Sequence, residues 1–379
     1  MTEAPPISAP ANLAPLTPDN TNQEEVFSRA FAILRQAVAE KVFPCACAAV
    51  TCKGKLVALQ SFGHFTFEPD SPVALPETIF DLASVTKVVA TTTMAMILYQ
   101  RGLLDIEMPI VSVLPEFVAE STGGRDPRRG EITFRMLLAH ASGLPAHVAF
   151  YEQADTRDEI ARLACTTPLT ADPGTRVEYS DVGFLVLAEA LIRLADEDLD
   201  SFCKREIFGP YGMTHTSYNP PRELRASIPP TVNDASFRHR MIQGEVNDEN
   251  ASAMRGVAGH SGIFAPAADV ALFAHRLLRG GAPVLRTETI TLFTRRQTSP
   301  AGTSRALGWD TPSAPSQAGK HFSPTSFGHL GYTGTSLWID PERKISVTLL
   351  TNRTWPDCQN KGIREVRPRF HDAVMEALI

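Results

Sequence analysis

Strand-like sequence occurs near both ends of this 379-residue chain, and the sequence between the two ends is mostly helix-like. Residues 46–52 and 56–62 are joined by Lys53-Gly54, a pattern that indicates a β-hairpin. Near the other end, residues 335–339 and 345–351 are strongly β-like and flank a short polar turn. This order predicts one sheet assembled from the two termini, with a helical domain inserted in the middle.

The predicted boundaries divide the chain into three parts. We expect an α/β domain over residues 23–88 and 251–379, and an inserted helical domain over residues 89–250. Residues 1–22 are rich in Pro, Ala and Thr and lack the basic start and apolar segment of a signal peptide, so they predict a disordered leader. A chain from which a signal had been removed would look similar, so export stays open.

Helices are predicted where apolar residues recur at helical spacing. The first follows a capping-box pattern, Thr21-Asn22-Gln23-Glu24, and extends to about Val38. The later ones cover residues 88–100, 182–194, 267–278 and 369–379. Residues 182–194 are almost continuously apolar, which predicts a buried helix.

Charge and cysteine content exclude several classes of function. With 36 Lys and Arg against 42 Asp and Glu, the formal charge is -6 and no long basic run occurs, so we expect no nucleic-acid partner. No apolar stretch approaches the length of a membrane span. The six cysteines fit no zinc pattern, so we interpret them as free thiols of a reducing compartment and predict a cytoplasmic location, with no metal and no cofactor.

Ser84-Val85-Thr86-Lys87 places a nucleophile and a base three residues apart. On a helix these two side chains share a face. Residues 88–100 contain no Pro or Gly, so Ser84 would lie at a helix N-terminus, where developing negative charge is favoured. A second copy, Ser201-Phe202-Cys203-Lys204, lies in what resembles an ordinary charged helix, so the motif alone is weak.

Tyr179 is the first candidate partner for this pair, because it comes just before the buried helix. A lysine ammonium beside a phenol would lower the pKa of the phenol, which could then relay protons. The alternative is a packed structural tyrosine, with Asp181 as the N-cap of the helix.

The second candidate segment is Gly328-His329-Leu330-Gly331-Tyr332, which leads into a strand. Small residues beside an edge strand let a substrate lie against the backbone, which then offers N–H groups. The alternative is a plain turn with a surface histidine. We set aside Gly259-His260-Ser261-Gly262, because position 263 is Ile rather than the glycine of a nucleophile elbow.

From about Ala48 to Trp355, the chain resembles the serine β-lactamase and penicillin-binding-protein family, specifically its class C branch and the related carboxylesterases. Besides the three blocks above, residues 137–145, 208–216 and 256–264 are similar to family segments and occur in the family's order. The resemblance implies an α+β fold, an antiparallel sheet flanked by helices with an inserted all-helical domain, and an active site between the two. It also favours Ser84 over Ser201.

Carried over by position, the resemblance implies that Ser84 is the acylated nucleophile. It implies that Lys87 and Tyr179 share the general-base and general-acid roles, with the first base left open. His329-Leu330-Gly331 would occupy the place of the family's Lys-Thr-Gly, and the N–H groups of Ser84 and Tyr332 would form the oxyanion hole. The expected substrate-binding and oxyanion residues are thus Tyr332, His329, Gly331 and Asp181.

Two departures from the family pattern bear on the substrate. Tyr179-Ser180-Asp181 stands where the family has Tyr-x-Asn, and His329, mostly neutral at pH 7, replaces a lysine that helps to hold a substrate carboxylate. We therefore expect a cofactor-free carboxylesterase acting on small esters. One alternative is a β-lactamase or D-Ala-directed carboxypeptidase, and another is a non-catalytic binding protein on the same fold. The expected partner of an enzyme of this kind is a small-molecule ester or amide substrate.

The acyl and leaving groups of the substrate are not determined by these motifs, and neither is the oligomeric state. We expect the choice of substrate to depend on four loops, around Tyr151, Asn250, Arg255 and His321.

Overall fold

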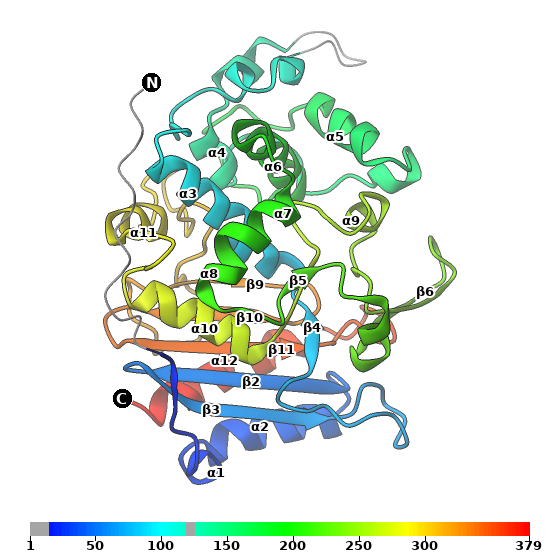
Figure 1. Cartoon of the computed structure of the whole chain (residues 1–379), viewed down its shortest axis with the longest axis vertical. Coiled ribbons are helices and arrows are strands. Elements are labelled where there is room, and N and C mark those ends of the chain that lie inside the picture. The colour runs from blue at the N-terminus through cyan, green and yellow to red at the C-terminus, as the bar shows by residue number, and fades with distance from the viewer. Residues whose placement is uncertain (1–14, 119–125) are drawn as a thin grey trace.

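The computed structural model describes residues 15–118 and 126–379, and its main layer is a six-stranded sheet with strand order β1-β3-β2-β11-β10-β9 (Figure 1). The expectation of one sheet built from both termini is confirmed, because three strands come from each end of the chain. They are β1 (Thr17–Pro18), β2 (Cys45–Cys52), β3 (Lys55–Gly63), β9 (Phe327–Leu330), β10 (Ser336–Asp340) and β11 (Ile345–Thr351).

The sheet is mixed rather than wholly antiparallel. The hairpin β2–β3 turns at Lys53-Gly54, where both residues have positive φ, and β2 continues antiparallel to β11 from Ala46↔Thr351 to Cys52↔Ile345. The two-residue strand β1, however, runs parallel to β3. The predicted antiparallel sheet is therefore correct for every pair except this short edge strand.

Strand β2 is buried on both faces because helices cover both sides of the sheet. Cys45, Cys47 and Ala49 point into the core that includes α10 (Ala267–Leu278). The alternate residues Ala46, Ala48 and Val50 point into a second core with α2 (Ser28–Ala39) and α12 (Ile363–Glu376). This alternation is the period of two expected for a strand, and the small side chains let both helical layers pack closely.

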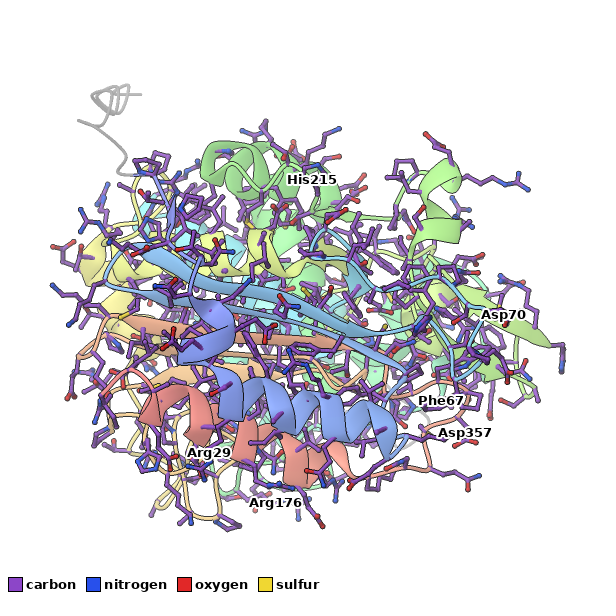
Figure 2. All side chains as sticks on the ribbon, turned by 90° about the horizontal axis from the view of Figure 1, so that it is seen from below. Arg29, Phe67, Asp70, Arg176, His215 and Asp357 are labelled. Carbon is purple, nitrogen blue, oxygen red and sulfur yellow. The ribbon has the colours of Figure 1, made fainter. Side chains whose placement is uncertain are left out.

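Helices α2 and α12 lie side by side on the outer face, where Arg29 forms an ion pair with Glu376 (Figure 2). Helix α12 begins earlier than the predicted residue 369 and contains Pro368. Proline cannot donate to the carbonyl of Arg364, four residues before it. That carbonyl accepts from Gln317 Nε2 instead (3.1 Å), so the helix continues through the proline.

The N-terminal predictions need two corrections. Residues 15–22, assigned to a disordered leader, follow a defined path that includes β1 and an ion pair between Asp19 and Lys55 (2.7 Å). Residues 1–14 lie outside the described part of the chain. The capping box is also wrong, because α1 (Gln23–Val26) has Asn22 at its N-cap without a side-chain hydrogen bond.

The inserted segment is mostly helical but not all-helical. Its strand β5 (Ser217–Tyr218) pairs with β8 (Ile263–Pro266), which also pairs with β4 (Ile79–Asp81), and β6 (Pro230–Asp234) forms a hairpin with β7 (Arg240–Gln243). The boundaries at 88/89 and 250/251 stay a prediction. The remaining helices are α3 (Thr93–Gln100), α4 (Phe134–Leu138), α5 (Arg157–Thr166), α6 (Asp181–Ala195), α7 (Leu199–Cys203), α8 (Gly209–Tyr211), α9 (Glu249–Ala253) and α11 (Thr287–Thr294).

All six cysteines are free, as expected, and four of them are buried. Burial raises the pKa of the Cys47 thiol to about 12, so this thiol stays protonated and behaves as a small apolar side chain. Within residues 15–118 and 126–379, none of the helices is both long enough and apolar enough to cross a bilayer.

Candidate active site

Ser84 lies in a 3₁₀ turn, Ala83–Val85, between β4 and the helix that ends at Gln100. The predicted helix exists, but its first part, Lys87–Thr92, is π-helical before α3 begins. Ala83 has a φ of 46°, a left-handed conformation that costs energy for a residue with a Cβ. A strained backbone conformation persists only where the surrounding structure fixes it, as it does at a turn that presents a nucleophile.

Lys87 is buried, with 0% of its surface exposed, and its Nζ contacts three acceptors. Nζ donates to Ser84 Oγ (3.0 Å), to Asp181 Oδ1 (2.6 Å) and to the carbonyl of His260 (3.1 Å). An ammonium has three N–H donors, so these contacts use all of them. Burial lowers the pKa of Lys87, but the adjacent Asp181 and Tyr179 outweigh burial, and the pKa lies above its ordinary value.

Tyr179 lies against this lysine, with Lys87 Nζ 4.9 Å from its ring centroid. Lys87 and Ser84 both act on its hydroxyl in the direction that lowers the pKa of the phenol, so both lie near enough for a proton relay. Burial nevertheless raises the pKa of Tyr179, and the neighbouring ammonium only partly offsets that rise. The predicted lowering of the pKa of this phenol is therefore wrong, because the cost of desolvating a phenolate exceeds the attraction of a cation already paired with Asp181.

Asp181 is the first residue of α6 and not its N-cap, so the alternative interpretation of this residue is wrong. Ser180 is the N-cap, and its Oγ accepts from the N–H of Gly183 (2.9 Å). The Ser180 N–H donates to His140 Nδ1 (3.0 Å). Because Ser180 performs the capping, the carboxylate of Asp181 is available for Lys87.

His140 is a contributor that the sequence motifs did not single out. Its ring packs against Tyr179 and Phe184, with centroid distances of 4.6 and 5.0 Å, while Nδ1 holds the backbone of Ser180. These contacts of His140 therefore hold the Tyr179–Asp181 segment in position. The only signal for it was its place in the family-like segment 137–145.

The turn between β9 and β10 carries the other predicted residues. His329 is only 2% exposed, so the interpretation as a surface histidine is wrong. Burial, together with the charges of Lys87 and Arg305, holds the pKa of His329 well below its ordinary value, and the expected neutral imidazole is confirmed. Its Nδ1 lies 2.8 Å from the carbonyl oxygen of Leu330.

This turn is attached directly to the nucleophile segment. Thr333 and Thr335 donate their hydroxyls to the carbonyls of Asp81 and Leu82, both at 2.9 Å. Gly331 is required here, because a Cβ at this position would overlap the Thr335 hydroxyl and lie 2.6 Å from the Leu82 carbonyl oxygen. The half-exposed Tyr332 follows at the surface of the turn, and its N–H takes no part in the turn's own hydrogen bonds, Gly331 N–H to Thr335 O and Gly334 N–H to Gly331 O.

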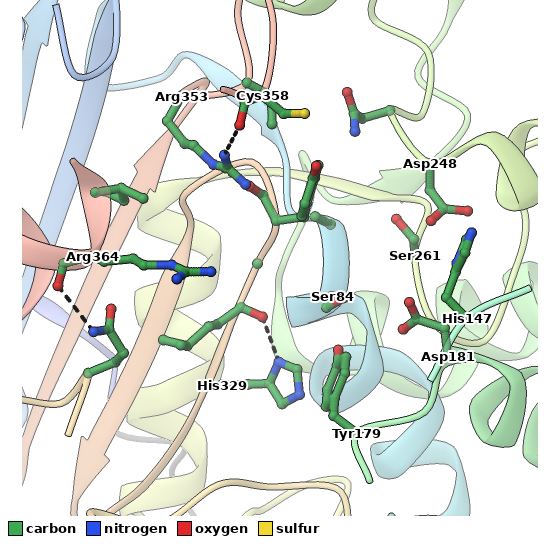
Figure 3. Close-up of a pocket in the computed structure, with 18 of the residues that line it drawn as sticks. Ser84, His147, Tyr179, Asp181, Asp248, Ser261, His329, Arg353, Cys358 and Arg364 are labelled. Atoms are coloured by element: carbon green, nitrogen blue, oxygen red, sulfur yellow. Dashed lines mark hydrogen bonds between the residues drawn. The ribbon is translucent and has the colours of Figure 1, made fainter. Parts of the chain in front are cut away.

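These groups open into a cavity of about 890 Å³ (Figure 3). Six of the seven predicted site residues line it, and the seventh, Lys87, contacts Ser84 and Asp181 from within the core. Ser201 is exposed on α7, which supports choosing Ser84. The lining residues are Ala83, Ser84, His147, Tyr179, Asp181, Val232, Asn247, Asp248, Glu249, Ser261, Arg305, Asp310, Gln317, His329, Leu330, Gly331, Tyr332, Arg353, Thr354, Cys358, Lys361, Ile363, Arg364 and Arg367.

The four loop residues expected to shape the choice of substrate, Tyr151, Asn250, Arg255 and His321, are not among the lining residues of this cavity. The loop around Asn250 nevertheless lines it through Asn247, Asp248 and Glu249, so the expectation about the loops stays a prediction. Further charged lining comes from Arg305 and from the 353–367 segment, and Asp248 Oδ1 lies 2.8 Å from His260 Nε2. Arg305 and the 353–367 segment are distant in sequence from Ser84, and no local motif marked them.

Asp81 is a buried carboxyl directly beneath the nucleophile turn, and it accepts from the N–H groups of Ala83 (2.8 Å) and Asn247 (2.7 Å). Burial raises the pKa of Asp81 from 3.8 to about 6, although the two hydrogen bonds oppose that rise. The folded protein therefore binds this proton more tightly than the unfolded chain does, and the associated stability is lost as the pH rises through 6.

We expect the free energy of unfolding of the wild type to fall by about 1 kcal/mol, relative to Asp81→Asn, between about pH 5 and about pH 8. Urea denaturation of the two proteins at both pH values measures this difference. If the free energy of unfolding changed with pH in the same way in both proteins, Asp81 would not have a raised pKa in the folded state.

Comparisons with known proteins show what this chain is similar to. A family model described as "Beta-lactamase" matches residues 31–366. The chain is 31% identical over 346 residues to the "N-acetylmuramyl-L-alanine amidase" of Bacillus subtilis (strain 168), covering 82% of this chain and 77% of the relative. It is 30% identical over 314 residues to a "Putative D-alanyl-D-alanine carboxypeptidase" of Escherichia coli (strain K12), covering 75% and 71%. Among solved structures, "EstCE1, a hydrolase with promiscuous acyltransferase activity" has the same fold, with a TM-score of 0.75 at 21% identity over 94% of this chain and 100% of that one.

Proposed function

This chain belongs to the beta-lactamase family of serine hydrolases, and we propose that within the family it hydrolyses small carboxylic esters through an acyl-enzyme on Ser84. The observation that carries the proposal is His329. At the strand position where the family's lysine helps to hold a substrate carboxylate, this chain has a buried, neutral imidazole. An ester with an uncharged group at that position loses little from the exchange, whereas a β-lactam or a peptide ending in D-Ala loses an ionic contact.

The contacts of Lys87 suggest how Ser84 is activated. Because the nitrogen of the Lys87 ammonium has no lone pair to take up a proton, Lys87 can accept the serine proton only as it gives one up. The proton acceptor at 2.6 Å is Asp181. In the proposed step, Ser84 Oγ bonds to the substrate carbonyl carbon while its proton passes to Lys87 Nζ, directly or through the Tyr179 hydroxyl, and Lys87 passes one proton to Asp181. Net charge is conserved, since the carboxylate becomes neutral as the oxyanion forms.

The later steps reverse this transfer. The proton returns through Lys87 or Tyr179 to the departing alkoxide, and a water molecule then repeats the sequence on the acyl-enzyme. In this proposal, the backbone N–H groups of Ser84 and Tyr332 bind the oxyanion. Each role is assigned from the position and contacts of the residue, and substituting that residue tests the role.

A comparison of substrates tests the proposal. Wild-type protein is expected to hydrolyse p-nitrophenyl acetate and butyrate with kcat/KM at least ~10²-fold above that for a chromogenic cephalosporin, on the scale of one lost charge-assisted contact. Intact-mass spectrometry during ester turnover should show a protein–acyl adduct, and peptide mapping should locate it on Ser84. Equal or faster cephalosporin turnover would overturn the preference for esters.

A D-Ala-directed amide hydrolase is the second candidate, and Arg305 favours it. The Arg305 guanidinium carbon lies 5.3 Å from the Tyr179 ring centroid, and the residue lines the cavity, so it offers a cation near the vacated lysine position. The amidase and carboxypeptidase relatives point in the same direction. A stable penicilloyl adduct on Ser84, lost in Arg305→Ala, would favour this candidate over the esterase.

A further inference from the structure

The contact between Lys87 and the backbone of His260 fixes the direction of the ammonium group. Lys87 Nζ donates to the His260 carbonyl at 3.1 Å, and its other two N–H groups donate to Ser84 and Asp181. The three donors of an ammonium turn together about the bond between Cε and Nζ. A displaced His260 carbonyl would therefore turn the other two N–H groups away from the serine and the aspartate.

The side chain of His260 is held by Asp248. The histidine is buried, with 1% of its surface exposed, and Nε2 lies 2.8 Å from Asp248 Oδ1. Burial raises the pKa of Asp248, but His260, the Ala251 N–H and Lys87 outweigh burial and hold that pKa well below its ordinary value. Asp248 is thus an ionised acceptor, so Nε2 carries the proton of this hydrogen bond. Nδ1 has no hydrogen-bond partner among the described residues, so the contact with Asp248 orients the ring.

The backbone around His260 is tied at two points to the helical segment that follows the nucleophile. The Gly259 carbonyl accepts from the Thr91 hydroxyl (2.6 Å), and the Ile263 N–H donates to Thr86 Oγ1 (3.1 Å). These ties lie on either side of the peptide that carries the His260 carbonyl and do not bond to it. The orientation of that peptide therefore depends on how the ring of His260 is held.

Asp248 is itself tied to the turn that carries Ser84. The N–H of Asn247, the residue before it, donates to the Asp81 carboxylate (2.7 Å), which also accepts from the N–H of Ala83 (2.8 Å). These contacts close a circuit that begins and ends at Ser84, so two routes hold the nucleophile and its base in register. The circuit runs through Ala83, Asp81, Asn247, Asp248, His260 and Lys87.

We propose that Asp248 and His260 are a positioning pair for Lys87. By fixing the ring of His260, Asp248 fixes the carbonyl that takes the third N–H of the ammonium, which leaves the other two N–H groups aimed at Ser84 and Asp181. This proposal rests on the acyl-enzyme reaction proposed above and concerns how its base is aimed. The role requires from Asp248 a hydrogen-bond acceptor for Nε2 rather than a negative charge.

A direct contact with the substrate is the competing role for Asp248. Its side chain is 22% exposed and lines the cavity on the side that carries Asp181 (Figure 3). The two roles predict different kinetics. A positioning residue acts on the chemical step and changes kcat, whereas a residue that only binds the substrate changes KM.

Two substitutions of Asp248 separate these roles. Asp248→Asn keeps an oxygen that can accept from His260 Nε2, so kcat for p-nitrophenyl butyrate should stay within about 3-fold of the wild type. Asp248→Ala removes the acceptor and should lower kcat by about 10- to 100-fold, the loss expected when a catalytic group is misplaced by about 1 Å. KM should change by less than about 2-fold in both variants.

Asp248→Ser is the matched control for helix capping, because Asp248 also caps α9 by accepting from the Ala251 N–H (2.8 Å). Serine is a good N-cap residue, but its hydroxyl oxygen ends one bond short of the aspartate oxygen that contacts His260. This variant should therefore lose kcat as Asp248→Ala does. Wild-type kcat in Asp248→Ala or Asp248→Ser, an equal loss in Asp248→Asn, or a rise in KM with kcat unchanged would overturn the positioning role.

Substitutions of His260 provide a second route if Asp248→Ala fails to fold. His260→Gln keeps an Nε2 donor for Asp248 and His260→Leu removes it, so only the leucine variant should lose kcat. In Asp248→Ser/His260→Leu the loss should not exceed that of the worse single variant, because both residues act through one contact. Additive losses would show that the two residues act separately, and the pair would be rejected.

Chemical labelling of Ser84 decides the inference even if no ester is hydrolysed. The rate at which diisopropyl fluorophosphate modifies Ser84 depends on the activation of its hydroxyl and does not require ester turnover. Asp248→Ser should slow this labelling by about 10-fold or more relative to the wild type and to Asp248→Asn. Equal rates in the three proteins, or no labelling of the wild type, would reject the positioning pair. Slowed labelling without ester turnover would reject only the proposed ester hydrolysis.

Discussion

Replacing Ser84 with alanine is expected to reduce the hydrolysis of p-nitrophenyl butyrate to near its uncatalysed rate, a loss of about 10⁴-fold or more in kcat. Alanine removes the Oγ that receives a hydrogen bond from Lys87 at 3.0 Å, and no acyl-enzyme can form without it. The measurement is initial-rate kinetics with intact-mass analysis, in which the acyl adduct should also disappear.

The second serine-lysine copy provides the control for this experiment. Ser201 has the same spacing to Lys204 but is exposed on α7, away from the cavity, so Ser201→Ala should retain wild-type rates and the acyl adduct. Circular dichroism and thermal unfolding of both variants check that the fold is unchanged. Substantial ester turnover in pure Ser84→Ala would mean that another group performs the reaction, and the assignment would fail.

Asp181→Asn is expected to have two separable effects on the pH–rate profile. In the wild type, Asp181 and Tyr179 hold the pKa of Lys87 above its ordinary value against burial, and the proposed relay works with Lys87 protonated, so kcat/KM should not depend on deprotonation of Lys87. Without the carboxylate, Ser84 can pass its proton only to a neutral Lys87, and burial, now less opposed, lowers the pKa of that lysine, so a limb in which kcat/KM rises with pH should appear. The plateau should fall by about 10²-fold, because the proposed terminal proton acceptor is gone.

Stability should fall as well. The raised pKa of Lys87 contributes stability at every pH below the unfolded value and loses it as the pH rises through the folded value. Removing the partner of a lysine that is 0% exposed leaves a buried charge uncompensated, which typically costs about 3 kcal/mol. Urea denaturation of the wild type and of Asp181→Asn near neutral pH measures this cost. The substitution also introduces the amide found in the family's Tyr-x-Asn motif.

Glu249→Gln is the control for charge removal, since Glu249 lines the same cavity without contacting Lys87. It should keep the wild-type profile, without the new limb. The absence of that limb in Asp181→Asn would show that Asp181 is not the group that lets a protonated Lys87 act. A new limb with an undiminished plateau would show that Asp181 controls the protonation of Lys87 but is not the terminal proton acceptor.

Much of this site follows from local sequence. Ser84 and Lys87 meet because residues three apart on a helical turn share a face, and the separation is short enough for the chain itself to enforce. The β2–β3 hairpin is similarly local, since Lys53-Gly54 supplies the positive φ values that its turn requires. The order of the family-like segments then places Tyr179 and His329 beside that pair.

Residues that lie far apart in the chain could be brought together only by the tertiary structure. Lys87 and Asp181 are 94 residues apart, and no spacing rule connects them. Arg364 on α12 is likewise far in sequence from Ser84 and Asp181, yet it lines the same cavity.

The motif around Ser84 and Lys87, four of the six strands of the central sheet (β2, β3, β10 and β11) and their arrangement from both termini were determined by the sequence itself. The direction of each pKa shift was decided by the tertiary structure. A motif shows that Tyr179 has a cation nearby, but desolvation depends on every segment that excludes water from the phenol, and here it outweighs that cation. Burial and charge pairing are sums over the whole packed chain, which is why the chemistry of this site depends on contacts that no local pattern contains.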